Sequence, residues 1–173
     1  PSDGGSSTSS PTNAGSNVTF TATATDADSD NYYLAICKTN AVTAGTSAAP
    51  TCDGGNWSIS SSTASGAQAS TTYTTSSSDS ESNAWYAFVC DHDTSALCSS
   101  SSQGTGTTGS PFLVNFVPTV ASLGPSSLTD GSSTTDTTPS LNFDLDDDNA
   151  SDPIGYRIQI DNSSDFSSPL ADY

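Results

Sequence analysis

The chain has 173 residues, with 19 acidic side chains against two basic ones, and its formal net charge is −17. A surface this acidic excludes nucleic acid as a partner, because phosphate binding needs basic side chains, and it disfavours insertion into or binding to anionic membranes. Hydrophobic residues make up only 32% of the chain. These residues nevertheless cluster in alternating runs, which favours folded β-structure over disorder.

The first clear strand signal covers residues 18–25, after a polar leader at residues 1–17. Apolar side chains at every second position alternate with threonines there, as in a half-buried strand. No segment shows helical periodicity with caps. Residues 41–50 and 99–110 are rich in small residues and are predicted to be loops. Further short strands are predicted at residues 32–37, 57–60, 71–75, 84–90 and 112–117.

The strand pattern restarts after Pro118. Strands are predicted at residues 120–123, 139–145 and 156–160, with an acidic turn at residues 146–152. The order of strand, acidic turn and aromatic-led strand matches residues 18–37, which is a weak internal repeat. We therefore expect a first domain at residues 1–117. Residues 118–173 are expected to supply the first strands of a second, incomplete domain, which further chain or a neighbouring subunit would complete.

Two sequence runs resemble known families. The run TPSLNFDLDDDNASDPIGYRIQIDNSSDFSSPLADY resembles fibronectin type III-like modules of large bacterial surface proteins. YYLAIC and SNAWYAFVCD, in the first unit, are similar to immunoglobulin-like repeats that occur in tandem in secreted proteins. The fold class implied is all-β, an Ig-like or fibronectin III-like β-sandwich with one complete and one incomplete domain. The resemblance implies an extracellular stalk, adhesin or filament whose partners are neighbouring copies or domains, and no catalytic site.

Four cysteines are present, and an even number in such a chain suggests disulfides and an oxidising compartment. In an Ig-like sandwich the strands at 32–37 and 84–90 share a sheet, and if antiparallel they place Cys37 and Cys90 at opposite ends, roughly 15–20 Å apart. A disulfide needs Cα atoms within about 7 Å, so the local pairs Cys37–Cys52 and Cys90–Cys98 are favoured. One alternative is free thiols. The other is a zinc site, but zinc sites use close-set cysteine pairs such as C-x-x-C, and neither gap between neighbouring cysteines here fits that spacing.

Five aspartates are candidate calcium ligands. Asp26, Asp28 and Asp30 have the alternate spacing of a calcium loop, although the full EF-hand pattern is absent. In an Ig-like fold the loop that carries Asp91 and Asp93 lies at the same end of the sandwich. These five carboxylates predict a calcium site at that end. The alternative is a set of solvated turns, which aspartate favours in any case.

A second, weaker calcium site is predicted at the junction of the two units. Asp79 and Glu81 form an acidic pair at the opposite end of the first unit, in an arrangement similar to that of cadherins. The linker VPTVAS lacks the acidic residues that cadherins use. The matching loop of the second unit carries Asp144, Asp146, Asp147, Asp148 and Asp152.

Catalysis is not expected. His92, between Asp91 and Asp93, is the single histidine and hence the one candidate base for a serine triad, but no G-x-S-x-G elbow is present. The alternative function is an adhesin module that binds a ligand or a surface glycan, which an exposed Trp57 or Tyr32 would favour. Glycosylation sequons begin at Asn17, Asn56, Asn149 and Asn162.

Overall fold

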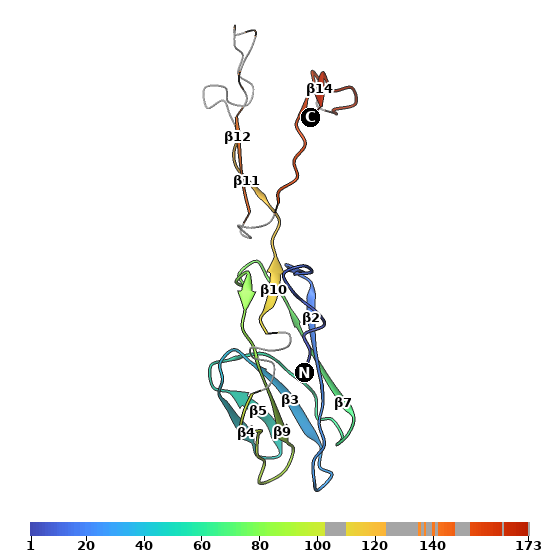
Figure 1. Ribbon diagram of the computed structural model, residues 1–173, viewed down its shortest axis with the longest axis vertical. Helices are drawn as coiled ribbons and strands as arrows, with labels where there is room; N and C mark the ends of the chain where they lie inside the picture. The colour runs from blue at the N-terminus through green and yellow to red at the C-terminus, as the bar shows by residue number, and fades with distance from the viewer. Residues whose placement is uncertain are drawn as a thin grey trace. The chain divides into compact units, whose positions relative to one another are not determined.

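The computed structural model describes residues 1–102, 110–123, 135, 137, 140, 142–147, 153–163 and 165–172. All regular elements in these ranges are β-strands, and no helix there is long and apolar enough to cross a membrane. The chain divides into two compact units, Pro1–Phe116 and Val117–Tyr173 (Figure 1). The division lies next to Pro118, where the strand pattern restarts.

Ten strands are described in unit 1, and most of them overlap strands that the sequence predicts. They are β1 (Thr12–Asn13), β2 (Asn17–Thr23), β3 (Tyr32–Cys37), β4 (Val42–Gly45), β5 (Ala48–Cys52), β6 (Asn56–Ile59), β7 (Gln68–Thr74), β8 (Ser82–Asn83), β9 (Tyr86–Asp91) and β10 (Phe112–Asn115).

Two ladders organise unit 1. Strand β2 pairs with β7 antiparallel over seven residue pairs, from Asn17↔Thr74 to Thr23↔Gln68. Strand β3 lies between β6 and β9 and is antiparallel to both. The remaining pairings in unit 1 are shorter: β10 lies between β1 and β8, and β4 pairs with β5. The arrangement is all-β and consistent with a β-sandwich.

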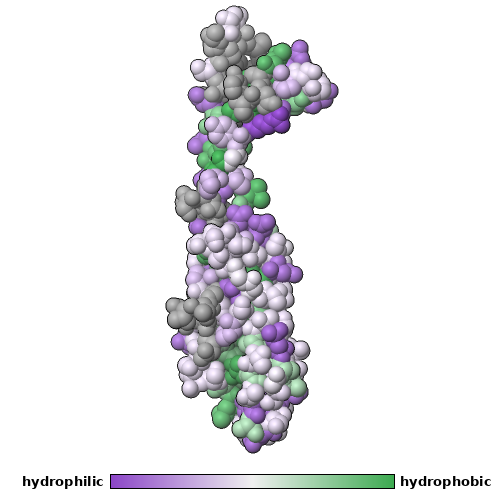
Figure 2. Space-filling view, turned by 45° about the vertical axis from the view of Figure 1, so that its right-hand side comes forward, coloured by the Kyte–Doolittle hydropathy of each residue, from purple (hydrophilic) through white to green (hydrophobic). Residues whose placement is uncertain are grey.

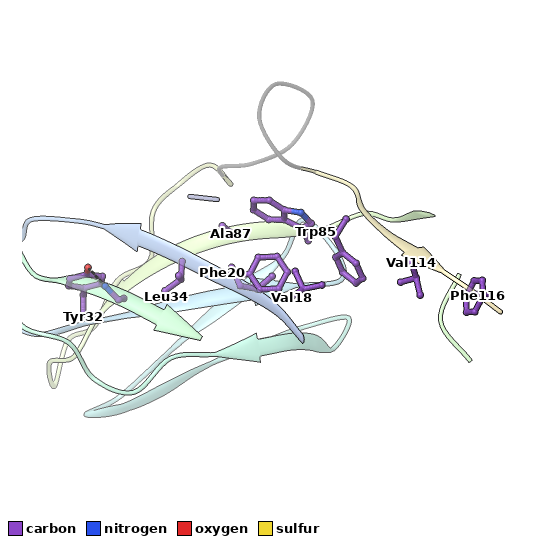
Figure 3. Close-up of a cluster of buried hydrophobic side chains, with 11 residues drawn as sticks. Val18, Phe20, Tyr32, Leu34, Trp85, Ala87, Val114 and Phe116 are labelled. Atoms are coloured by element: carbon purple, nitrogen blue, oxygen red, sulfur yellow. Dashed lines mark hydrogen bonds between the residues drawn. The ribbon is translucent and has the colours of Figure 1, made fainter. Parts of the chain in front are cut away.

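The main core lies between the β2·β7 ladder and the β6–β3–β9 sheet. Phe20 of β2 meets the Trp85 ring edge-on, with ring centroids 5.2 Å apart, and contacts Phe112 at 6.1 Å. Figure 3 shows this cluster running from Tyr32 at one end to Phe116 at the other. The alternation of strand β2 explains its role, because Val18 and Phe20 point inward while the intervening threonines face outward.

The other face of β3 and β9 is covered as well, which the sequence did not predict. All six residues of β3 are buried. A second cluster on this face contains both disulfides, with Cys37, Cys52, Phe88 and Cys90 at its centre. The prediction of a loop at residues 41–50 is wrong, because strands β4 and β5 form a hairpin there. Its small residues carry too little apolar signal to mark strands, and the bond to Cys37 holds the hairpin against β3.

Unit 2 contains two short antiparallel pairs among its described residues. Strand β11 (Thr119–Leu123) pairs with β12 (Phe143–Asp146), and β13 (Gln159–Ile160) pairs with β14 (Ala171–Asp172). The predicted strands at 139–145 and 156–160 are therefore shorter than expected where they can be described. The Phe143 ring of β12 packs against the Tyr156 ring, with ring centroids 5.1 Å apart.

Candidate functional site

The acidic loop at residues 26–30 is organised around Asp26. Its Oδ1 accepts hydrogen bonds from the backbone amides of Asp28 at 2.8 Å and Asp30 at 3.3 Å. The Asp26 amide itself donates to Ser65 Oγ at 2.9 Å. The carboxylate of Asp26 therefore shapes the turn, while the side chains of Asp28 and Asp30 stay exposed.

The end of strand β9 lies beside this loop, as the sequence predicted. Asp91 is paired with Tyr32 at the start of β3, and the His92 amide donates to the Asn31 carbonyl at 2.8 Å. Asp26 and Asp91 line one shallow pocket, together with Tyr32. The antiparallel pairing of β3 and β9 thus brings two of the five candidate calcium ligands to a common surface.

Asp91 and Asp93 also have local roles. Asp91 Oδ1 accepts a hydrogen bond from the Leu97 amide at 2.9 Å. Hydrogen bonds from the Thr94 backbone and hydroxyl lower the pKa of the Asp93 carboxyl below its usual value. Within the described ranges, no three His, Cys, Asp or Glu side chains are grouped closely enough to hold a metal ion. Calcium binding by the five aspartates stays a prediction.

Asp79, a candidate for the junction site, is occupied by local contacts. Its Oδ1 accepts a hydrogen bond from the Tyr73 hydroxyl and its Oδ2 accepts one from the Ser76 amide, both at 2.8 Å. Burial and the neighbouring carboxylate raise the pKa of Tyr73 to about 12. This carboxylate therefore fixes the turn after β7.

The other candidates for the junction site show no common ligand set. Glu81 is exposed, and its backbone carbonyl accepts a hydrogen bond from the Val114 amide at 2.9 Å. Asp144 and Asp146 lie on β12 of unit 2. Asp148 and Asp152 lie outside the described residues. The junction site stays a prediction without a described geometry.

Both disulfides join the cysteines that the sequence analysis paired. Cys37 is bonded to Cys52 and Cys90 to Cys98, with Cα separations of 5.3 and 4.0 Å. The register of β3 and β9 places Cys37 opposite Tyr86, and Tyr33 opposite Cys90, so the two strands do carry their cysteines at opposite ends. Each bond holds a neighbouring segment against the central strands.

His92 has a hydrogen-bond partner that the sequence did not reveal. Its Nδ1 lies 2.9 Å from Ser62 Oγ, and Asn31 Nδ2 donates to the same hydroxyl at 3.1 Å. The Tyr33 ring packs against the imidazole, with centroids 5.1 Å apart. Ser62 and His92 are 30 residues apart, so no local motif signals the pair. No described carboxylate hydrogen-bonds to the imidazole, so the cluster lacks the third member of a triad.

Asp3 is a buried carboxylate that the sequence analysis did not single out. Only 4% of the residue is exposed, and Oδ2 has no hydrogen-bond partner among the described residues. Burial raises the pKa of Asp3, while hydrogen bonds from the Gly5 amide and the Trp85 side chain act in the opposite direction. A lone acidic residue in a polar leader gives no signal of this burial, because Trp85 comes from a distant part of the chain.

The two aromatic residues proposed for glycan binding are used inside unit 1. Tyr32 is 2% exposed, and its hydroxyl accepts hydrogen bonds from the amides of Ala24 and Ala69. The Trp57 ring lies edge-on to two other aromatic rings, and its Nε1 donates to the Ala84 carbonyl. Lys38 Nζ lies 4.3 Å from the centroid of the same Trp57 ring. Neither ring is a free platform for a sugar.

The chain matches no family model, and no curated protein or solved structure is significantly similar to it.

Proposed function

We propose that this chain is a structural module of an extracellular bacterial surface protein, stalk or filament built from tandem β-sandwiches. The observation that carries the proposal is the double covering of the central strands β3 and β9. One face packs on the β2·β7 ladder, and the other is covered by segments that the two disulfides hold. Such a unit resists local opening, which suits a part that transmits force or sets a spacing.

The strand pairing supports an immunoglobulin-like or fibronectin III-like sandwich for unit 1. β3 and β9 are antiparallel neighbours in one layer, and β2 and β7 are antiparallel neighbours in the facing layer. The parallel pairing of β1 with β10 closes one side of the unit. Sandwiches of this kind join end to end in tandem proteins.

The disulfides support an extracellular location. All four cysteines are bonded, and none is free. Disulfides persist in oxidising compartments and are rare where thiols are kept reduced. The net charge of −17 also supports an extracellular location. A surface of like charges prevents non-specific aggregation of an assembly that is exposed to solvent.

The adhesin alternative has less support than the structural role. It rested on an exposed Trp57 or Tyr32, and both rings are engaged within unit 1. Calcium remains part of the proposal at the end of unit 1 where Asp26 and Asp91 share a pocket. Carboxylates at that position can bind a cation and relieve their mutual repulsion.

Imaging of the native assembly by electron microscopy tests the structural role. We expect extended particles with a regular axial repeat of sandwich-sized units. Isolated globular particles without an axial repeat, in material taken directly from its source, would contradict the proposal. A glycan array probed with the same material is the matching test of the adhesin alternative, for which binding to a defined glycan is the supporting outcome.

A further inference from the structure

Strand β7 exposes one edge of the β2·β7 ladder. On β2, the backbone N–H and C=O of Thr21 both bond to Ser2, so they point away from β7. Ser70 is the register partner of Thr21, and in an antiparallel ladder its own backbone groups then point away from β2. The same alternation applies to Thr72 and Thr74. Besides Gln68 at the start of the strand, three residues of β7 therefore direct their N–H and C=O groups toward the outer edge of the ladder.

These edge groups have no partner within the part of the chain that the structure describes. No backbone or side-chain hydrogen bond there involves the amide or carbonyl of Ser70, Thr72 or Thr74. The three side chains are exposed. Figure 1 shows β7 at the margin of unit 1. The edge is thus open to a further strand.

The other long strands of unit 1 have their edges covered. The outer edge of β2 pairs with Ser2. Strand β9 is covered by the segment that the Cys90–Cys98 disulfide closes, since the Asp91 amide donates to Leu97 O and Val89 O accepts from the Ser99 amide. Strand β3 is paired on both sides, and its neighbour β6 has four residues with an irregular register. Among the longer described strands of unit 1, β7 keeps an open edge.

Strand β7 also lacks the features that normally protect an edge. Natural edge strands are shortened, bulged, or given charges or proline, because an open edge recruits other strands. The sequence of β7, QASTTYT, contains neither a charged residue nor proline, and its ladder with β2 runs through seven pairs without a shift.

We propose that the β7 edge binds the β7 strand of a second copy of this chain, antiparallel and across a two-fold axis. The two β2·β7 ladders then form one continuous four-stranded sheet. This inference deepens the proposed function, because it names a lateral contact between neighbouring modules. It involves a different surface from the end-to-end contacts that set an axial repeat.

The register of this pairing follows from the alternation of β7. Only residues whose backbone groups face the edge can form hydrogen-bonded pairs, so even-numbered positions must meet even-numbered positions. Centring the axis on Thr72 pairs Thr72 with Thr72 of the second copy and Ser70 with Thr74, which uses all three edge residues. About six backbone hydrogen bonds result.

The side chains and the charges favour a second copy as the occupant. The pairing places hydroxyl groups opposite hydroxyl groups, and Thr–Thr and Thr–Ser cross-strand pairs are favourable. Each hydroxyl both donates and accepts, so the edge is complementary to itself. No charged side chain lies opposite another at this edge, whereas contacts elsewhere on two such acidic copies bring like charges together.

Sedimentation velocity over a concentration series tests the contact with the whole chain. We expect a concentration-dependent dimer whose association strengthens with added salt, because salt screens the repulsion between the two acidic copies. Thr72→Lys places two ammonium groups opposite each other and should weaken association about tenfold or more. Thr19→Lys is the matched control, since Thr19 is the register partner of Thr72, one strand inside the edge. It should associate as the parent chain does.

Oxidative cross-linking tests the proposed register of the two β7 strands. In the proposed pairing the two Thr72 Cα atoms lie about 5.5 Å apart, within the range of a disulfide. Thr72→Cys should therefore give covalent dimers, and Thr19→Cys should not. A chain that stays monomeric at every salt concentration, or equal effects of the changes at 72 and 19, would overturn the proposal. An axial repeat seen by microscopy would survive that result, so the two failures are distinguishable.

Discussion

The two units of the chain treat their apolar residues in different ways. In unit 1 the largest side chains, such as Trp85 and Phe20, are fully buried. In unit 2 the described residues Val120, Tyr156 and Leu170 are 62%, 62% and 73% exposed. A sheet buries its apolar face only when a second layer covers it, and unit 1 has a layer on each side of β3 and β9. The face of unit 1 seen in Figure 2 is mostly pale, as expected for Ser and Thr side chains.

The largest expected difference between the units concerns single aromatic side chains. Trp85→Ala removes a fully buried indole and should cost about 3–5 kcal/mol of the unfolding free energy of unit 1. Tyr156→Ala removes a side chain that is mostly exposed and should change stability by about 0.5 kcal/mol or less. Urea unfolding followed by far-UV circular dichroism for both variants gives the two values. Similar losses in the two variants would contradict the contrast drawn between the units.

Removing each disulfide in turn measures how much the segments that cover β3 and β9 contribute to the stability of unit 1. Replacing Cys37 and Cys52 together by Ala opens a loop with a sequence separation of 15 and should cost about 3 kcal/mol, because the unfolded chain gains entropy. The same change at Cys90 and Cys98, with a separation of 8, should cost about 2.5 kcal/mol. Thermal unfolding of both double variants checks the order. A larger loss for the shorter loop would show that packing, and not loop closure, dominates.

Calcium removal tests the acidic end of unit 1. If the Asp26 and Asp91 region binds calcium in the folded state alone, a tenfold excess over Kd adds about 1.4 kcal/mol to stability. The midpoint of thermal unfolding should then fall when a chelator is added. Asp91→Asn should abolish the shift, whereas Asp53→Asn, which changes an exposed carboxylate outside both candidate calcium sites, serves as the control. An unchanged midpoint in the parent chain would remove the calcium site from the proposal.

A further small effect is expected from Asp3, as a pH dependence of the stability of unit 1. Its pKa is raised in the folded state, so folding disfavours the charged form. The contribution of this group to stability is therefore best at low pH and declines as pH rises through the interval above the usual pKa of 3.8. Asp3→Asn removes that decline, and we expect a gain of about 1 kcal/mol or less at pH 7 that shrinks toward pH 3. Urea unfolding at the two pH values measures it, and a loss at pH 7 contradicts it.

Much of unit 1 could be predicted because its strands are either alternating or continuous apolar runs. The strand at 32–37 has the predicted bounds, and the inward residues of β2 form the core. The hairpin of β4 and β5 could not be predicted in the same way, because Ala, Thr and Gly carry little periodic signal. Its position depends on the bond between Cys37 and Cys52 and on the second cluster.

The candidate sites also differ in how far the sequence could predict them. The meeting of Asp26 and Asp91 followed from one antiparallel pairing, so the sequence could anticipate it. The contact of Ser62 with His92 depends on how the loop after β6 packs against the end of β9, and no spacing in the sequence encodes it. The open edge of β7 has the same origin, because an edge is defined by the strands that are absent beside it.

The sequence alone determined the all-β class, the acidic surface and the local pairing of the cysteines. The first two follow from residue type and from the spacing of apolar residues over a few neighbouring positions, and the cysteine pairing follows from the direction and length of the two strands that carry Cys37 and Cys90. Only the tertiary structure decided that β3 is covered on both faces, that the Asp3 carboxylate is buried and that β7 keeps an open edge. Each of these depends on which distant segments meet, and short-range patterns do not specify such contacts.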